Sequence, residues 1–192
     1  MRRLLVTGGA GFIGSNFIRY WMRRHAGDRV INLDALTYAG NLESLAEVES
    51  APGYRFVHGD ITNRELVLQV LREEQVDTVV NFAAESHVDR SILGPDAFIN
   101  TNIQGTFALL EAAKAAGVRR FVFSSSCSNY GAAGEDWLDE TAPLNPVTPY
   151  AVSKVRCEEG LDRLAGDFGL PPTLRTIGEA GPEDEILVRV PE

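Results

Sequence analysis

Short apolar runs alternate along the chain with longer segments whose apolar residues recur every three or four positions. The short runs predict strands at residues 3–7, 30–34, 55–60, 78–84 and 119–125. The longer segments predict helices at residues 13–24, 63–74, 95–117 and 150–166. Strand and helix follow each other through most of the chain. This order predicts an α/β fold with a doubly wound, Rossmann-like parallel sheet.

The C-terminal part of the chain follows this alternation less clearly. Residues 131–148 hold two prolines and several acids and are too long for a simple connector, so we interpret them as a functional loop. Residues 172–177 are a candidate sixth strand. The tail, residues 178–192, is either an edge strand or a frayed end, and the pattern leaves both open.

Composition narrows the function classes. The 192 residues are 44% hydrophobic and 23% charged, as in an ordinary globular domain, and the net charge of -9 argues against a nucleic-acid partner. No apolar run approaches the roughly 18 residues of a membrane span. Cys127 and Cys157 are the two cysteines, and the start of the chain lacks a signal peptide, so we expect a reduced cytoplasmic protein. The three histidines lack the spacing of metal ligands, and we expect no metal site.

A glycine motif follows the first predicted strand. Gly8, Gly11 and Gly14 lie between that strand and the first predicted helix. Glycine lets the backbone approach a pyrophosphate, and the helix N-terminus directs free N–H groups at it. The motif therefore predicts a dinucleotide site, with an ordinary β-α turn as the alternative.

Asp34 ends the second predicted strand, 20 positions after Gly14. A carboxylate there accepts hydrogen bonds from adenosine ribose hydroxyls and repels a 2′-phosphate, which favours NAD over NADP. The alternative is an Asp that caps a turn.

Tyr150 and Lys154 have the spacing of one helix face. We expect the ammonium group to lower the pKa of the phenol, which would suit it for proton transfer. Ser124, Ser125 and Ser126 end the fifth predicted strand, where ligands bind in such sheets. The alternatives are a surface pair and a polar strand end.

These residues together resemble the extended short-chain dehydrogenase/reductase family, in particular its NAD-dependent nucleotide-sugar epimerases and dehydratases. Residues 7–14, 33–42, 58–61, 83–92 and 101–106 carry the resemblance. The first two thirds are most similar to the dTDP-glucose 4,6-dehydratase branch. The reaction centre is more similar to the sugar 4-epimerases.

The resemblance implies an NAD-binding Rossmann domain at residues 1–177, followed by the tail. It implies catalytic roles for Ser126, Tyr150 and Lys154, and contacts of His87, Ser126 and Tyr150 with a dTDP- or UDP-hexose. The cofactor contacts that it implies, with those already inferred, are Gly8, Gly11, Phe12, Ile13, Gly14, Asp34, Leu36, Thr37, Asp60, Ile61, Ala83, Ala84, Ser86, Thr101 and Lys154. A homodimer is left open.

Two departures from the family pattern matter. The dehydratases carry Thr-Asp-Glu where this chain has Ser126, Cys127 and Ser128, and in that family the Asp and Glu act as acid and base in the elimination. A thiol and a hydroxyl do not match those tasks. The resemblance also fades after about residue 175, so we expect the C-terminal substrate domain to be truncated.

Three hypotheses follow. The first is a nucleotide-sugar epimerase or dehydratase that oxidises the sugar at C4. The second is an NAD-binding module with little turnover, which the chain length favours. The third is a short-chain reductase of a small carbonyl compound.

Overall fold

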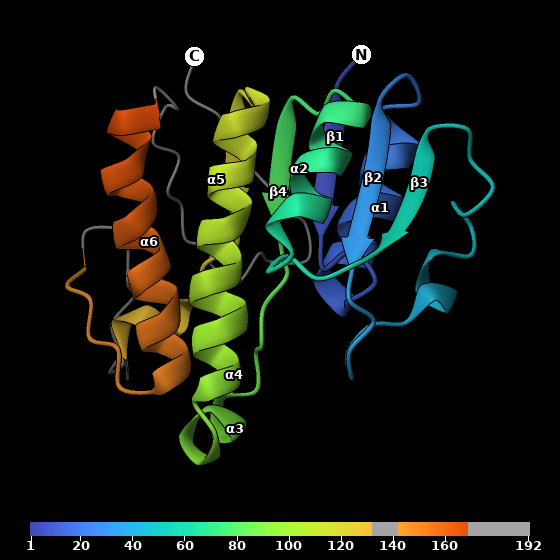
Figure 1. The fold of residues 1–192 in the computed structure, drawn as a ribbon. Helices are drawn as coiled ribbons and strands as arrows, with labels where there is room; N and C mark the ends of the chain where they lie inside the picture. The colour runs from blue at the N-terminus through green and yellow to red at the C-terminus, as the bar shows by residue number, and fades with distance from the viewer. Residues whose placement is uncertain (132–141, 169–192) are drawn as a thin grey trace.

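The computed structural model describes residues 1–131 and 142–168. Five parallel strands form one sheet in the order β3-β2-β1-β4-β5 (Figure 1). Their bounds are β1 Arg3–Thr7, β2 Arg29–Asp34, β3 Tyr54–His58, β4 Thr78–Asn81 and β5 Arg120–Phe123. The predicted doubly wound α/β sheet is confirmed.

The central strand β1 is apolar on both faces, which explains its place in the sheet. Leu5 of β1 is in register with Ile31 of β2 and Val79 of β4, and all three are fully buried. Leu4 and Val6 alternate with Leu5 and belong to the core on the opposite face. A strand buried on both faces requires helices on both sides.

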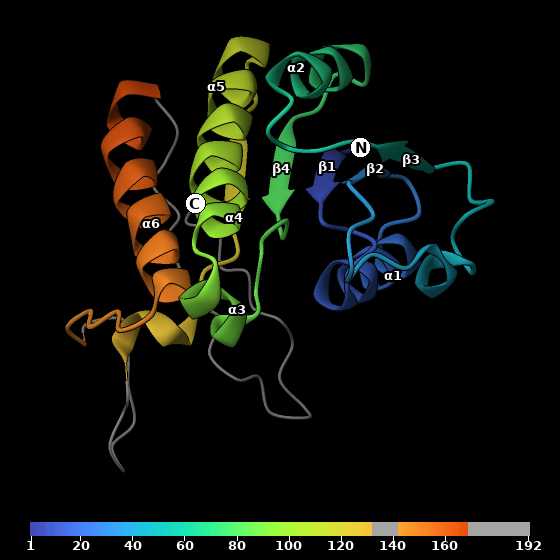
Figure 2. The same cartoon turned by 60° about the horizontal axis from the view of Figure 1, so that its bottom comes forward.

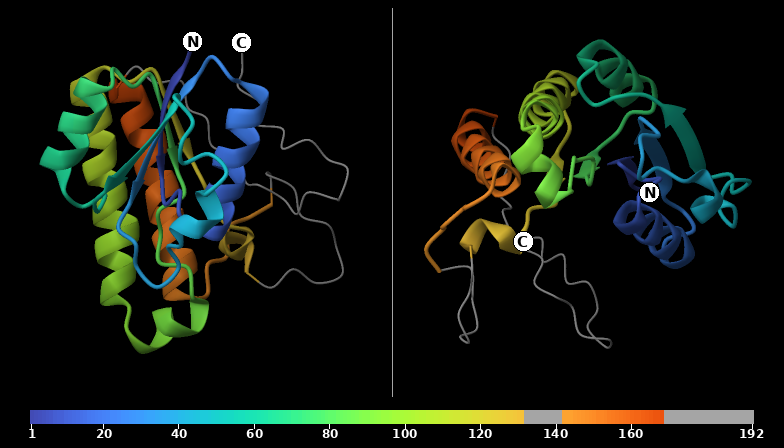
Figure 3. Two further views of the ribbon diagram at one scale, coloured as in Figure 1. Left: turned by 90° about the vertical axis from the view of Figure 1, so that its right-hand side faces the viewer. Right: turned by 90° about the horizontal axis from the view of Figure 1, so that it is seen from below.

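Helices supply these two layers, as the view from below shows (Figure 3). On one face, α1 (Phe12–Arg24) and the 3-10 helix η1 (Leu42–Leu45) pack on the sheet through apolar side chains such as Ile18 and Leu45. On the other, α2 (Arg64–Glu73), α5 (Thr106–Ala116) and α6 (Pro149–Phe168) contribute to the second core (Figure 2).

The predicted helix 95–117 consists of three pieces. It begins as α4 (Asp96–Phe98), widens into the π-helix η2 (Ile99–Gly105) and continues as α5. The π turn places Asn102, which is 1% exposed, against the loop after β4. Wide turns of this kind often mark functional sites.

The predicted strand 78–84 is too long by three residues. The ladder ends at Asn81 because side chains then bind the backbone: Thr7 accepts from the N–H of Ala83, and Asn102 from that of Glu85. The short helix α3 (Val88–Leu93) follows, which the periodicity did not predict.

Other expectations concern the C-terminal part. The candidate strand 172–177, the tail 178–192 and part of the loop 131–148 lie outside the described residues. Within the described ranges, no helix is long and apolar enough to cross a bilayer.

Candidate functional site

The site forms where the chain leaves β1 and β4 in opposite directions. After β1 it enters α1 on one face, and after β4 it leads to the helices on the other. At the two strand ends the Thr7 hydroxyl donates to Asn81 Oδ1 at 2.6 Å. Doubly wound sheets bind ligands in the crevice at such a switch point.

At two of the predicted glycine positions, the surrounding backbone leaves no room for a side chain. Gly8 has φ +68, and a Cβ there would lie 2.6 Å from the backbone nitrogen of Ala83. At Gly14 a Cβ would lie 2.3 Å from the Gly8 carbonyl oxygen. The loop therefore packs backbone against backbone, which larger residues would prevent.

The N-terminus of α1 lacks a side-chain cap. Its N-cap is Gly11, and its first turn has no acid. Phe12 and Ile13 in that turn are 84% and 59% exposed. An uncapped helix end offers N–H donors and partial positive charge to an anion.

Asp34 connects this loop to the next one. Its Oδ2 accepts from the N–H of Ala10 at 2.8 Å, and its Oδ1 from the N–H of Leu36 at 2.8 Å. The N–H of Asn41 returns to the Ala10 carbonyl at 2.9 Å, which closes the segment around Thr37 against the glycine loop. Asp34 thus caps a loop, as the alternative interpretation held, and also lies beside the glycine loop.

Asp60 and Ile61 extend the site beyond β3. The N–H of Gly59 donates to the Asp34 carbonyl at 3.0 Å, so the ends of β2 and β3 are adjacent. Asp60 Oδ1 accepts from both the N–H and the hydroxyl of Thr62 at 2.8 Å. Ile61 is 3% exposed and packs in the core, which leaves only its backbone for the predicted adenine contact.

The loop after β4 forms the other wall. Ala83 lies against Gly8, and Ala84 and Ser86 follow it. Asn102 holds this wall, because its side chain accepts from the N–H of Glu85 at 2.8 Å and donates to the Glu85 carbonyl at 3.1 Å. Thr101 precedes Asn102 on the π turn.

His87 is exposed at the start of α3. Its ring centroid lies 5.2 Å from that of Tyr38, and the Arg90 guanidinium lies 4.8 Å from the Tyr38 centroid. The contact joins the loop after β2 to the loop after β4, and β2 and β4 flank β1 in the sheet.

The residues predicted to be reactive come together near the start of α6. Thr148 caps this helix through its hydroxyl, which accepts from the N–H of Ala151 at 3.2 Å. Tyr150 shares a hydrogen bond with the Ser126 side chain, and Lys154 Nζ donates to the Ser124 carbonyl at 2.9 Å. The predicted group of Ser126, Tyr150 and Lys154 is therefore assembled at the end of β5.

The expected effect of Lys154 on Tyr150 is wrong in this structure. Burial raises the pKa of Tyr150, and the hydrogen bond with Ser126 opposes this only in part. Burial also lowers the pKa of Lys154 to about 8. The Nζ atom lies 5.9 Å from the phenol ring centroid and donates to a carbonyl, so its charge does not govern the phenol.

Three buried residues of this region were missed by the sequence analysis: Asn102, Asn129 and Glu158. Asn102 also donates to Ser153 Oγ at 2.9 Å, and Ser153 donates to the Tyr150 carbonyl at 2.7 Å. Glu158 had a usable signal, because it continues the four-residue spacing of Tyr150 and Lys154.

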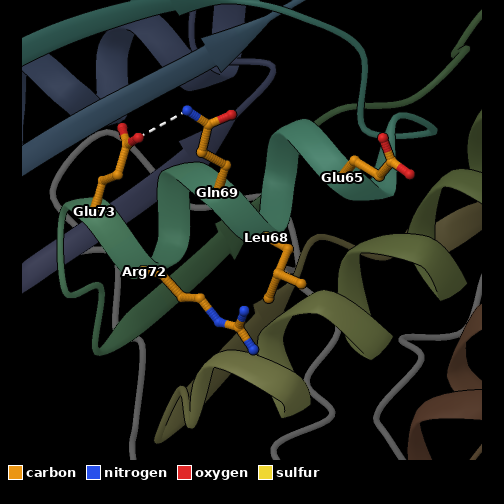
Figure 4. A pocket seen from close by; sticks show the side chains of 5 residues that line it. All are labelled: Glu65, Leu68, Gln69, Arg72 and Glu73. Carbon is orange, nitrogen blue, oxygen red and sulfur yellow. Dashed lines mark hydrogen bonds between the residues drawn. The ribbon is translucent and has the colours of Figure 1, made fainter.

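A surface hollow lies elsewhere, on α2 (Figure 4). Its lining residues all belong to that helix: Glu65, Leu68, Gln69, Arg72 and Glu73. None of the predicted site residues is among them. Across residues 1–131 and 142–168, no group of three or more His, Cys, Asp or Glu side chains could hold a metal ion.

Comparison with known proteins agrees with this geometry. Residues 5–177 match the family model of GDP-mannose 4,6 dehydratase. The chain is 48% identical to a dTDP-glucose 4,6-dehydratase of Xanthomonas campestris, over 89% of this chain and 51% of that protein. It is 46% identical to one of Mycobacterium tuberculosis, over 90% and 51%. The chain thus spans about half the length of these relatives.

Solved structures show the same likeness. The dTDP-glucose 4,6-dehydratase DesIV of Streptomyces venezuelae, crystallised with NAD and TYD, superposes with a TM-score of 0.82 at 48% identity, covering 88% of this chain and 53% of that one. The UDP-glucose 4-epimerase of Brucella ovis in complex with NAD gives 0.80 at 29% identity, covering 88% and 50%. The resemblance to extended short-chain dehydrogenases is confirmed, and the chain belongs to the GDP-mannose 4,6 dehydratase family.

Proposed function

We propose that this chain binds NAD in the crevice and forms the cofactor-binding half of an enzyme that oxidises nucleotide sugars at C4. One observation carries the proposal. Contacts run without a break along the carboxyl edge of the sheet, from Asp34 to Ala10 and from Gly8 to Ala83. Through Asn102 and Ser153 they then reach Tyr150.

The residues present fit NAD. The glycine loop packs so tightly that a Cβ at Gly8 or Gly14 would clash with backbone, and the uncapped end of α1 suits a pyrophosphate. Each Asp34 oxygen accepts one backbone N–H and keeps a lone pair for a ribose hydroxyl. A 2′-phosphate would meet this carboxylate, which favours NAD over NADP. The solved relatives crystallised with NAD support the same choice.

Bound NAD would supply the acceptor for the C4 hydride. Tyr150 would take the proton of the C4 hydroxyl, and Ser126, which is hydrogen-bonded to the phenol, would orient the same oxygen. Lys154 fixes the Ser124 carbonyl beside them. Burial raises the pKa of Tyr150, so the deprotonated phenol that would take this proton becomes more abundant, and oxidation faster, as the pH rises.

The fate of the 4-keto sugar distinguishes epimerase from dehydratase. Cys127 and Ser128 replace the acid and base of the dehydratases, which favours epimerisation. The named relatives, mostly dTDP-glucose 4,6-dehydratases, favour dehydration. C4 oxidation is the step that an epimerase and a dehydratase share, and we therefore propose that step for this chain.

Calorimetric titration with NAD and NADP tests the cofactor proposal. We expect NAD to bind more tightly. Asp34→Asn should weaken NAD by about one to two decades, because hydrogen bonds to a charged acceptor contribute roughly 1.5–3 kcal/mol. Asp96→Ala, at an exposed carboxylate of α4, is the control and should bind NAD unchanged. Tighter binding of NADP by the unmodified chain would overturn the assignment.

A further inference from the structure

Glu158 is a buried acid that the proposed reaction does not use. It lies on α6 one turn after Lys154, and it is 7% exposed. A buried carboxylate is costly unless its oxygens are bound. Burial raises the pKa of Glu158, and hydrogen bonds from Ser125 and Asn129 oppose that change. The two residues that donate these hydrogen bonds therefore indicate which segment of the chain Glu158 holds in place.

These partners form a closed triangle with it. Asn129 Nδ2 donates to Glu158 Oε1 at 2.8 Å, and the Ser125 hydroxyl donates to the same oxygen. Asn129 Nδ2 also lies 3.0 Å from Ser125 Oγ. Asn129 is fully buried and Glu158 nearly so, whereas Ser125 is half-buried.

The triangle encloses the turn that carries Ser126. Ser125 precedes Ser126, and Asn129 closes the turn by donating its N–H to the Ser126 carbonyl at 3.2 Å. The Ser126 hydroxyl also accepts from the N–H of Ser128 at 3.2 Å. Glu158 therefore binds this turn through a residue before Ser126 and a residue after it, namely Ser125 and Asn129.

One face of α6 thus binds three successive residues of the strand end. Lys154 holds Ser124, Glu158 holds Ser125, and Tyr150 meets Ser126. We infer that Glu158 is a positioning residue, which aligns the Ser126 hydroxyl with the Tyr150 phenol through Ser125 and Asn129. The inference deepens the proposed function, because it concerns the pair assigned to C4 oxidation.

Titration of the Tyr150 phenol tests this alignment without cofactor or sugar. The probe is the ¹³Cζ NMR resonance of labelled tyrosine, assigned with Tyr150→Phe. Glu158→Ala should raise the pKa of Tyr150 further, because the hydrogen bond with Ser126, which lowers it, is weakened. Glu158→Gln keeps an acceptor oxygen and should titrate as the unmodified chain does. Glu159→Ala is the matched control, since its side chain is 47% exposed and pairs with Arg156.

Ser125→Ala is the second variant, for the case in which circular dichroism shows Glu158→Ala to be unfolded. It removes the hydrogen bond between Ser125 and Glu158 by deleting the donor, and it should also raise the pKa of Tyr150. An unchanged phenol titration in a folded Glu158→Ala or Ser125→Ala variant would overturn the inference. An equal shift in Glu158→Gln would also overturn it, because charge and not alignment would then be responsible. Failure of NAD to bind would count against the proposed function alone.

Discussion

Single residues set the chemistry of this site through their burial. Lys154 is 3% exposed, and its ammonium group donates to the Ser124 carbonyl at 2.9 Å. Removing a charge from water disfavours its charged form, which explains the pKa of about 8. A lysine with such a pKa exchanges its proton near physiological pH, unlike an exposed one.

This burial makes stability depend on pH. Below pH 8 the group is protonated in both states, and the folded state bears the cost of the buried charge. Between pH 8 and 10.5 the unfolded chain binds more protons, so the free energy of unfolding rises with pH. We expect the rise to be of the order of 3 kcal/mol in the unmodified chain relative to Lys154→Met. Urea denaturation at stepped pH measures it.

Lys114→Met is the control for that series, because Lys114 is exposed on α5. Its pH profile should follow that of the unmodified chain. Parallel profiles for the unmodified chain and Lys154→Met would contradict the buried-charge account.

At the same scale, Cys127 and Ser128 bear on the outcome of the proposed sugar oxidation. Cys127 is exposed at the start of the 3-10 helix η3 (Cys127–Tyr130), and neither side chain is a carboxylic acid. With NAD and dTDP-glucose or UDP-glucose, we expect very weak formation of the 4-keto-6-deoxy product. Residual C4 oxidation or epimerisation should exceed it. Chromatography of the sugar products tests this, and robust 4-keto-6-deoxy sugar would show that other groups replace the acid and base.

At the scale of elements, the turn from β1 into α1 combines tight backbone contact with an open helix end. Gly8 and Gly14 bring the loop against itself and against Ala83. The helix then begins at Phe12, after the N-cap Gly11, without a side-chain cap. The same geometry that excludes side chains leaves the helix N–H groups accessible to phosphate oxygens.

Gly14→Ala tests this element. Its Cβ would lie 2.3 Å from the Gly8 carbonyl oxygen, so the loop must shift. We expect a loss of about 1–3 kcal/mol in the free energy of unfolding, as for other overpacked sites. NAD affinity should fall by about tenfold or more, since 1.4 kcal/mol of lost binding energy is a decade.

Gly27→Ala provides the comparison, because a Cβ there meets nothing within 4 Å. Its stability should change by no more than about 0.5 kcal/mol, and its NAD affinity should not change. Equal NAD binding by the two variants would contradict the assigned phosphate loop.

At the scale of the whole molecule, the sheet brings together loops that are far apart in sequence. The loop after β2 and the loop after β4 meet through the stack of Tyr38 and His87 on opposite sides of the glycine loop. The hollow of Figure 4 lies on α2, which takes no part in these contacts.

Hydrogen exchange with mass spectrometry should therefore show a localised footprint of NAD. We expect added protection at residues 8–14, 34–41 and 82–87, because these loops line one crevice. Residues 65–73 of α2 should exchange at an unchanged rate. Protection centred on α2 would relocate the ligand to the surface hollow.

Local sequence was sufficient for much of this protein. The periodicity of apolar residues predicted the parallel sheet. A strand or helix that is buried on one or two faces repeats its apolar residues at a fixed spacing, and this spacing is visible in the local sequence. The glycine spacing and the four-residue spacing of Tyr150 and Lys154 predicted the two halves of the candidate site, since turns and helix faces are local. Asp34 was assigned by its place at a strand end.

Only the tertiary structure decided the environment of these residues. It placed Ile61 in the core, ended β4 at Asn81 and raised the pKa of Tyr150 where a decrease was expected. It also gave Glu158 its partners, Ser125 and Asn129, from a segment about thirty positions earlier in the chain. Burial and hydrogen bonding depend on residues that come into contact only when the chain folds. The local periodicity of the sequence carries no information about these contacts.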